Sequence, residues 1–216
     1  MTPVYRTVDR AIQDADDAAY AVVKQPSHRP ARAASPTGRT SVALLTGRHE
    51  TAKRFEPLAI RLALDGHATT ITRSGDGTAI SLGEIRNPDV PFVLLGSDTG
   101  ALRALVLAGS PALRADGLVL LGLPLLQRPV SGEPLTELPP RALPDMPILL
   151  IHGDDDQISP LPLAQMLTRT APRAELAVVP SGHGVLRDSS FRWAAARILL
   201  FLETLIHSRV DTGKPT

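Results

Sequence analysis

Two kinds of hydrophobic pattern alternate along most of this chain. Short continuous apolar runs are typical of buried strands, whereas apolar residues spaced three or four positions apart lie on one face of a helix. The runs predict strands at 41–46, 68–73, 91–95, 117–121, 148–152 and 175–179. The spacing predicts helices at 51–65, 98–108, 161–170 and 191–207. Because strands and helices alternate, we expect an α/β fold, with about six mainly parallel strands and helices on both faces of the sheet.

The apolar faces of two helices can be assigned from the spacing. In the helix at 51–65 the expected apolar face is Phe55, Leu58, Leu62 and Ala63, with Pro57 in the first turn and Gly66 as a C-terminal cap. In the helix at 191–207 the expected apolar side is Trp193, Ile198, Leu199, Leu202 and Ile206.

The chain divides into three parts. Residues 1–40 are expected to form an amphipathic helix at 3–24 and a Pro/Ala/Arg linker, residues 41–207 the α/β domain, and residues 208–216 a tail. Seven prolines fall between positions 122 and 147. Proline at this density blocks helix formation, so we expect a loop there and not a helical cap over the domain.

Composition narrows the classes of protein and partner. With 216 residues, 43% of them hydrophobic, the chain can bury the core of one globular domain. A net charge of +1 gives no reason to expect nucleic acid or an anionic membrane as a partner. The absence of cysteine excludes disulfides and thiolate metal sites. No apolar run is long enough to span a membrane, and acidic residues stand where a signal peptide would be apolar, so we expect a cytoplasmic protein. The sequence leaves open whether the chain forms a homo-oligomer.

The strand at 91–95 ends in a short glycine-flanked turn that leads directly into a helix. The turn reads Gly96-Ser97-Asp98-Thr99-Gly100, with Asp98 at its tip. So tight a turn imposes strained dihedral angles on its central residue and tolerates only small residues two positions away. A plain glycine turn is one interpretation, and presentation of Asp98 to a ligand is the other.

Two further motifs, both at predicted strand ends, favour the second interpretation. Gly153, Asp156 and Pro160 follow the strand at 148–152 with the spacing G-x-x-D-x-x-x-P, and the strand at 175–179 precedes Gly-His-Gly at 182–184. Together with the turn at Asp98, these motifs make residues 41–207 resemble the α/β-hydrolase family, in which nucleophile, acid and base follow in this order.

The resemblance implies a role for each residue. Asp98 occupies the nucleophile position, Asp156 the acid position and His183 the base position. The family reads His-Gly-x in the loop after the first of these strands, where this chain reads Thr46-Gly47-Arg48. The backbone N–H groups of Arg48 and Thr99 are therefore expected to bind a developing negative oxygen. The side chain of Arg48 could bind a substrate carboxylate, pair with Asp98 and hold it ionised, or face solvent.

Neighbouring polar residues leave alternatives. Ser97 is a second candidate nucleophile, although an elbow turns the residue before its tip away from the histidine. Asp154 and Asp155 could replace Asp156 or simply cap the loop, and His152 is expected to be structural. Histidines 28, 49, 67 and 207 have no metal-site spacing, so we predict no metal, and no cofactor.

Aspartate in place of the usual elbow serine is the main departure from the esterase pattern. Haloalkane dehalogenases and epoxide hydrolases of this family use such an aspartate as a covalent nucleophile. They also stabilise the leaving group, with a tryptophan beside the nucleophile or with cap-domain tyrosines. This chain has Thr99 at the first position, and its only tyrosines are Tyr5 and Tyr20. The resemblance therefore implies the Asp98-His183-Asp156 set but not those substrates.

Several functions remain open on this evidence. The leading hypothesis is an enzyme acting on a small molecule, either by hydrolysis of an ester, lactone or similar bond, or by an acid–base step such as elimination or cyclisation. Asp98 would be a covalent nucleophile or a general acid or base. The alternative is a catalytically inactive binding or scaffold protein. Because aromatic residues are few, we expect a pocket lined by Leu, Val and Pro and a compact aliphatic ligand.

Overall fold

A single parallel sheet organises the structure, a computed structural model that describes residues 38–72, 82–83, 86–187 and 189–211. Its strands are β1 (Ser41–Leu45), β2 (Ala68–Thr72), β3 (Phe92–Ser97), β4 (Gly117–Leu121), β5 (Ile148–Gly153) and β6 (Ala174–Val179). They lie in the order β2-β1-β3-β4-β5-β6, and every neighbouring pair is parallel. The six predicted strands are confirmed to within two residues at each end.

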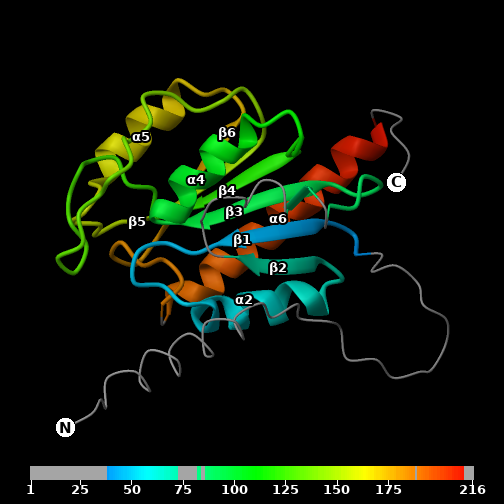
Figure 1. The fold of residues 1–216 in the computed structure, drawn as a ribbon, viewed down its shortest axis with the longest axis horizontal. Helices are drawn as coiled ribbons and strands as arrows, with labels where there is room; N and C mark the ends of the chain where they lie inside the picture. The colour runs from blue at the N-terminus through cyan, green and yellow to red at the C-terminus, as the bar shows by residue number, and fades with distance from the viewer. Residues whose placement is uncertain (1–37, 73–81, 84–85, 188, 212–216) are drawn as a thin grey trace, which may run out of the picture.

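Helices cover both faces of this sheet (Figure 1). They are α2 (Ala52–Leu64), α4 (Thr99–Ala108), α5 (Leu161–Arg169) and α6 (Ser190–Asp211). Successive side chains of a strand point to opposite faces, so one strand contributes to two cores. In β3, Val93 and Leu95 pack in the core beneath α2 and α6, whereas Phe92 and Leu94 pack in the core beneath α4 and α5. The predicted arrangement is confirmed.

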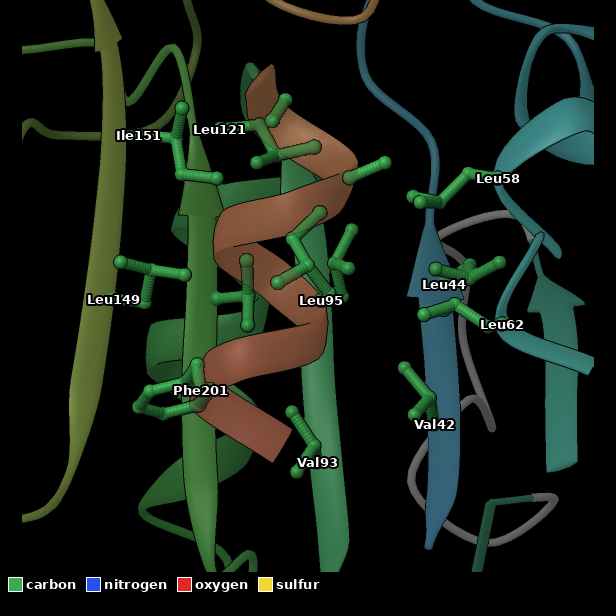
Figure 2. Close-up of a cluster of buried hydrophobic side chains, with 14 of the residues drawn as sticks. Val42, Leu44, Leu58, Leu62, Val93, Leu95, Leu121, Leu149, Ile151 and Phe201 are labelled. Atoms are coloured by element: carbon green, nitrogen blue, oxygen red, sulfur yellow. The ribbon is translucent and has the colours of Figure 1, made fainter. Parts of the chain in front are cut away.

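The core beneath α2 and α6 fixes the edge of the sheet next to the site. Figure 2 shows Leu44, Leu95, Leu121 and Ile151 projecting from four neighbouring strands toward the helices. All four are fully buried, and Phe201 of α6 belongs to the same core at the amino end of β4, where a Cβ on Gly117 would meet its ring. Each such side chain contributes roughly 1.5–3 kcal/mol when it leaves water. The strands are therefore held in register up to their carboxyl ends, where the polar motifs begin.

Helix α2 differs from expectation in two details. Pro57 lies one turn deeper than the first turn, and the buried face includes Ala59 where we expected Ala63. The Gly66 cap is confirmed: Gly66 has φ +84°, and its N–H donates to Ala63 O over 3.1 Å. The N–H of His67 donates to Leu62 O over 3.0 Å, which completes a Schellman motif and fixes the turn into β2.

Helix α6 corrects the expected position of Trp193. Its side chain is 64% exposed, and Leu199 and Ile206 are only partly buried. The fully packed face consists instead of Ala194, Ala195, Ile198, Phe201, Leu202 and Leu205. Steps of three and four residues from Ala194 give a face that excludes Trp193, because adjacent residues on a helix are about 100° apart. Ile198 and Leu202 are therefore confirmed as part of the apolar side, and the assignment of Trp193 to it is wrong.

The proline-rich segment at 122–147 contains no helix, as expected. Its only regular pairing is an isolated antiparallel bridge between Val130 and Glu133. The expected helix at 3–24, the linker up to residue 37 and residues 212–216 of the expected tail lie outside the described residues. Residues 208–211, which we expected to begin the tail, belong to helix α6. Among the helices that the structure does describe, none is long and apolar enough to cross a membrane.

Candidate active site

The turn between β3 and α4 holds Asp98 in a strained backbone conformation. Asp98 has φ 48° and ψ −122°, a region that costs a non-glycine residue roughly 1–3 kcal/mol. A Cβ on Gly96 would collide with the carbonyl of Gly100, and a Cβ on Gly100 would collide with the carbonyl of Leu45. Glycine is therefore required at both positions for α4 to turn back across β1 and β3. The geometry is that of a nucleophile elbow with Asp98 at its tip.

Arg48 engages both oxygens of the Asp98 carboxylate. Its Nη2 lies 2.7 Å from Oδ1, its Nε 2.9 Å from Oδ2, and its backbone N–H also donates to Oδ2 over 3.0 Å. Both side chains are almost fully buried. Burial by itself raises the pKa of Asp98, but hydrogen bonds from Arg48, His183 and the Thr99 N–H outweigh it and hold that pKa far below its ordinary value. Of the three alternatives for Arg48, the structure shows pairing with Asp98.

His183 lies between two carboxylates. Its Nε2 is 3.1 Å from Oδ1 of Asp98, and its Nδ1 is 2.9 Å from Oδ2 of Asp156. Burial lowers the pKa of His183, but its hydrogen bonds to Asp156 and Asp98 outweigh burial and raise the pKa to about 9. The ring is therefore an imidazolium at neutral pH and donates a hydrogen bond to each carboxylate.

Asp156 is held by the loop that leaves β5. Its Oδ1 accepts the N–H groups of Ile158 (2.8 Å) and Ser159 (2.9 Å), which leaves Oδ2 directed at His183. Burial raises its pKa, but the interaction with His183 and the bond from the Ser159 N–H lower it more. The completely buried His152 lies behind it, with Nε2 2.6 Å from Ser159 O and 3.5 Å from Asp156 Oδ2.

Asp154 and Asp155 have loop roles. Oδ1 of Asp154 accepts a hydrogen bond from the Ser181 N–H over 3.1 Å, and Oδ1 of Asp155 accepts one from Nε2 of Gln157 over 2.6 Å. Of the three successive aspartates at 154–156, only Asp156 contacts His183 among the described residues.

Glu50 is a site residue that the sequence reasoning missed. Its Oε1 accepts the hydroxyl of Ser97 over 3.0 Å, and its Oε2 accepts the N–H of Gly47 over 2.8 Å. Burial raises its pKa. Ser97 is thus turned toward Glu50 and away from His183, as the elbow geometry requires. Its position in the sequence could have indicated this role, because Glu50 follows the Thr46-Gly47-Arg48 loop by two residues.

The proline-rich segment contributes to the site through Arg48. Nη1 of Arg48 donates to the carbonyl of Arg128 over 3.2 Å and to the carbonyl of Glu133 over 3.1 Å. These bonds attach the turn around the Val130–Glu133 bridge to the residue that holds Asp98. The segment is not a cap domain, but it forms one wall of the site.

A pocket of about 420 Å³ opens at Asp98 and His183. The expected aliphatic lining is wrong: among the described residues the apolar side chains in the wall are Val130, Ile158 and Pro180. Charged and hydroxyl side chains make up most of the rest, including Arg48, Glu50, Arg54, Arg187, Ser181 and Ser190. The error arose because aromatic content says nothing about loop residues after strand ends, which supply this wall. Within the described ranges, no group of three or more acidic or histidine side chains could hold a metal ion.

Comparison with solved structures identifies the fold. A thioesterase, RedJ, from the prodiginine biosynthetic pathway of Streptomyces coelicolor is 16% identical and has a TM-score of 0.62, over 82% of this chain and 91% of its own. An esterase of Pyrococcus furiosus is also 16% identical, with a TM-score of 0.60 over 79% and 83% of the two chains. This chain has the α/β-hydrolase fold. A predicted hydrolase from Thermoplasma acidophilum shares it at 14% identity and a TM-score of 0.55, over 77% and 88% of the chains.

No family model matches the sequence, and neither does any curated protein. At these identities the α/β-hydrolase fold is shared and the chemistry must be argued from this chain's own residues.

Proposed function

We propose that this α/β-hydrolase-fold protein is a hydrolase of small esters or lactones, with Asp98 as a covalent nucleophile. The observation that carries the proposal is the position of His183, which lies within hydrogen-bond distance of both Asp98 and Asp156 at a pocket. Strain at the elbow supports it, because chains accept such strain mainly where a side chain must be presented to a ligand.

The direction of the pKa shift favours a nucleophile over a general base. A general base works best when its pKa is near the working pH, and the pKa of Asp98 lies far below that. A carboxylate that is ionised at every relevant pH needs no activation before it attacks carbon. The N–H of Arg48 bonds to Oδ2, so Oδ1, which faces His183, is the oxygen for attack.

The first step uses His183 as an acid. Oδ1 forms a bond to the ester carbon, the bond from that carbon to the leaving oxygen breaks, and imidazolium His183 gives its proton to the leaving oxygen. Asp98 and the substrate acyl group are then joined through Oδ1 as an uncharged anhydride. Because loss of the Asp98 charge removes one of the interactions that raise the pKa of His183, the ring stays neutral and can serve as a base.

The second step restores both groups. Neutral His183 takes a proton from water while the oxygen of that water bonds to Cγ of Asp98. Negative charge develops on Oδ2, where the N–H of Arg48 already donates. The bond between Cγ of Asp98 and Oδ1 then breaks. The product leaves as a carboxylate that carries Oδ1, and the new carboxyl group of Asp98 releases its proton. His183 is again protonated, and its bond to Asp156 fixes its orientation throughout.

One observation favours the alternative, an inactive binding protein. The Arg48 fork occupies both oxygens of Asp98, so attack requires Oδ1 to exchange the guanidinium for substrate. A protein that uses Asp98 only to anchor Arg48 would have the same contacts. Activity measurements distinguish the two.

The test is a screen of small esters and lactones with three proteins. The unaltered chain should hydrolyse some of them, and Asp98→Ala should lower kcat/KM by about 100-fold or more. Ser97→Ala is the matched control, because Ser97 is the neighbouring elbow residue and faces Glu50; it should change kcat/KM less than about fivefold. Full activity in Asp98→Ala would contradict the proposal, and loss confined to Ser97→Ala would make Ser97 the nucleophile.

A further inference from the structure

The loop that carries the Arg48 N–H turns on a glycine packed against the elbow. A Cβ on Gly47 would lie 2.5 Å from the carbonyl oxygen of Ser97 and 2.6 Å from Cβ of Asp98, so no larger residue fits there. Glycine has the widest range of backbone angles and no side chain to restrict them. Contacts from outside Gly47 must therefore fix the two peptide groups that meet at it.

Glu50 holds both of these peptide groups. Its Oε2 accepts the N–H of Gly47 over 2.8 Å, and its own N–H donates to the carbonyl of Gly47 over 3.3 Å. That carbonyl belongs to the same planar peptide group as the N–H of Arg48, which donates to Oδ2 of Asp98 over 3.0 Å. A contact that fixes the carbonyl therefore also fixes the direction of the Arg48 N–H.

The turn that Glu50 closes is strained. His49, the third of its four residues, has φ 54°, a left-handed value that is uncommon for residues other than glycine. Such a conformation persists only where the surrounding contacts over-determine it. The side chain of Glu50 supplies one of them from a position that is only 10% exposed. Its Oε1 accepts the hydroxyl of Ser97 over 3.0 Å, which leaves Oε2 directed at Gly47.

We infer that Glu50 is a positioning residue, which orients the Arg48 N–H toward Oδ2 of Asp98, where negative charge develops in the second step. The inference rests on the proposed function, because it is that step which places the charge on Oδ2. An N–H that is already oriented needs no reorganisation when the charge appears, and removal of one such donor costs about 100-fold or more in rate. Loss of the Glu50 carboxylate leaves the donor in place but able to turn, so its effect should be smaller.

Amide hydrogen exchange tests the positioning without turnover. Glu50→Met fills a similar space with no hydrogen-bond acceptor, so exchange at Gly47 and Arg48 should accelerate by at least about tenfold, the worth of one hydrogen bond. Glu50→Gln also removes the charge, but its amide oxygen can still accept from Gly47, so exchange should stay within about threefold of the unaltered chain. Amides in the middle of β5 serve as the reference for global unfolding.

Glu56→Met is the matched control. Glu56 is exposed on α2 and is not among the described lining residues of the pocket, and its replacement removes the same charge as Glu50→Met. Exchange at Gly47 and Arg48 should be unchanged in this variant.

Kinetics with a nitrophenyl ester supply a second arm. The rate at which the acyl adduct on Asp98 is hydrolysed should fall by at least about tenfold in Glu50→Met, because the Arg48 N–H no longer points steadily at Oδ2. The value of kcat/KM, which ends with the first step, should change less. Glu50→Gln should keep most of the adduct hydrolysis rate. Ser97→Ala keeps the bond from Gly47 to Oε2, in line with the small change expected of it above.

The outcomes for the positioning and for the chemistry are separate. Unchanged exchange at Arg48 in Glu50→Met would overturn the inference, and so would equal acceleration in Glu50→Met and Glu50→Gln, because the charge would then be what matters. If Glu50→Met does not fold, Glu50→Gln decides alone, since positioning predicts retained protection and a charge effect predicts its loss. Protection at Arg48 that Glu50→Met removes and Glu50→Gln keeps supports the positioning even if no ester is hydrolysed, and the proposed hydrolysis then fails by itself.

Discussion

Four charges alternate in sign through the site, in the order Arg48, Asp98, His183 and Asp156. Each is at least largely buried, so each depends on its neighbours for stabilisation. The two carboxylates are kept ionised and the imidazole is kept protonated by the same contacts. Removal of one charge should therefore be visible in the titration of the next.

The pH dependence of stability follows from His183. Its pKa is about 9 in the folded protein against an ordinary 6.5, so the folded state holds the extra proton between these values. The free energy of unfolding should be highest below pH 6.5 with respect to this group, and should fall by on the order of 3 kcal/mol as pH rises through 9. Urea unfolding from pH 6.5 to 10 measures this.

Two other histidines do not interfere in that range. Burial lowers the pKa of His67 and of His152, so their effect on stability falls below pH 6.5. His183→Gln should flatten the profile above pH 6.5, and a profile that keeps its slope in this variant would contradict the assignment.

Arg48→Met should raise the pKa of Asp98, because the opposite charge that favours the carboxylate is lost. It should also lower the free energy of unfolding by about 3 kcal/mol, since it leaves a buried charge with one partner fewer. Carbon-13 titration of the Asp98 carboxyl and urea unfolding give the two values. In Arg48→Met/Asp98→Asn the stability loss should shrink, because the buried carboxylate charge is also gone; an unshifted Asp98 pKa would argue against the pair.

At the scale of elements, the elbow shows what a sequence can predict. Gly96 and Gly100 flank Asp98 at a spacing that only a tight strand-to-helix turn requires, and backbone contacts explain both glycines. The exposure of Trp193 and the partner of the Arg48 side chain could not be predicted from such a spacing. The exposure of Trp193 depends on which of several neighbouring residues begins the buried face of α6. The orientation of the Arg48 side chain depends on Asp98, which lies 50 residues away in the sequence.

Gly96→Ala should destabilise the protein by more than about 2 kcal/mol, because its Cβ would collide with the Gly100 carbonyl and backbone cannot move aside cheaply. Gly83→Ala is the matched control, since a Cβ there meets nothing within 4 Å. Thermal unfolding of the two variants measures the difference. Equal melting temperatures would mean that the elbow has room for a Cβ at Gly96.

At the scale of the whole molecule, the site is assembled at the carboxyl ends of β1, β3, β5 and β6. The parallel direction of the strands followed from the alternation of strands and helices, so this edge could be predicted as the location of the polar motifs. The pocket wall could not be predicted from the sequence, because it depends on how the segment at 122–147 folds over Arg48. That segment has no periodic pattern to read, and its bonds to Arg48 come from two backbone carbonyls that any residue could supply.

Loss of the Arg48 side chain should loosen this segment. In Arg48→Met the carbonyls of Arg128 and Glu133 lose the hydrogen bonds that Arg48 donates, so amide exchange at Val130 and Glu133 should accelerate by at least about fivefold. Amides in the middle of β5 serve as the internal reference and should keep their protection. Unchanged exchange at Val130 would show that the Val130–Glu133 bridge holds the turn without Arg48.

Covalent use of Asp98 is tested most directly by mass spectrometry of His183→Gln. This variant lacks both the acid of the first step and the base of the second. An ester whose leaving group needs no proton, such as a nitrophenyl ester, should therefore leave an acyl adduct on the peptide that carries Asp98. A single turnover of the unaltered chain in ¹⁸O-water, with enzyme in excess, should place label in that same peptide and unlabelled oxygen in the first product acid. Label that appears directly in product, with no adduct in His183→Gln, would contradict the account.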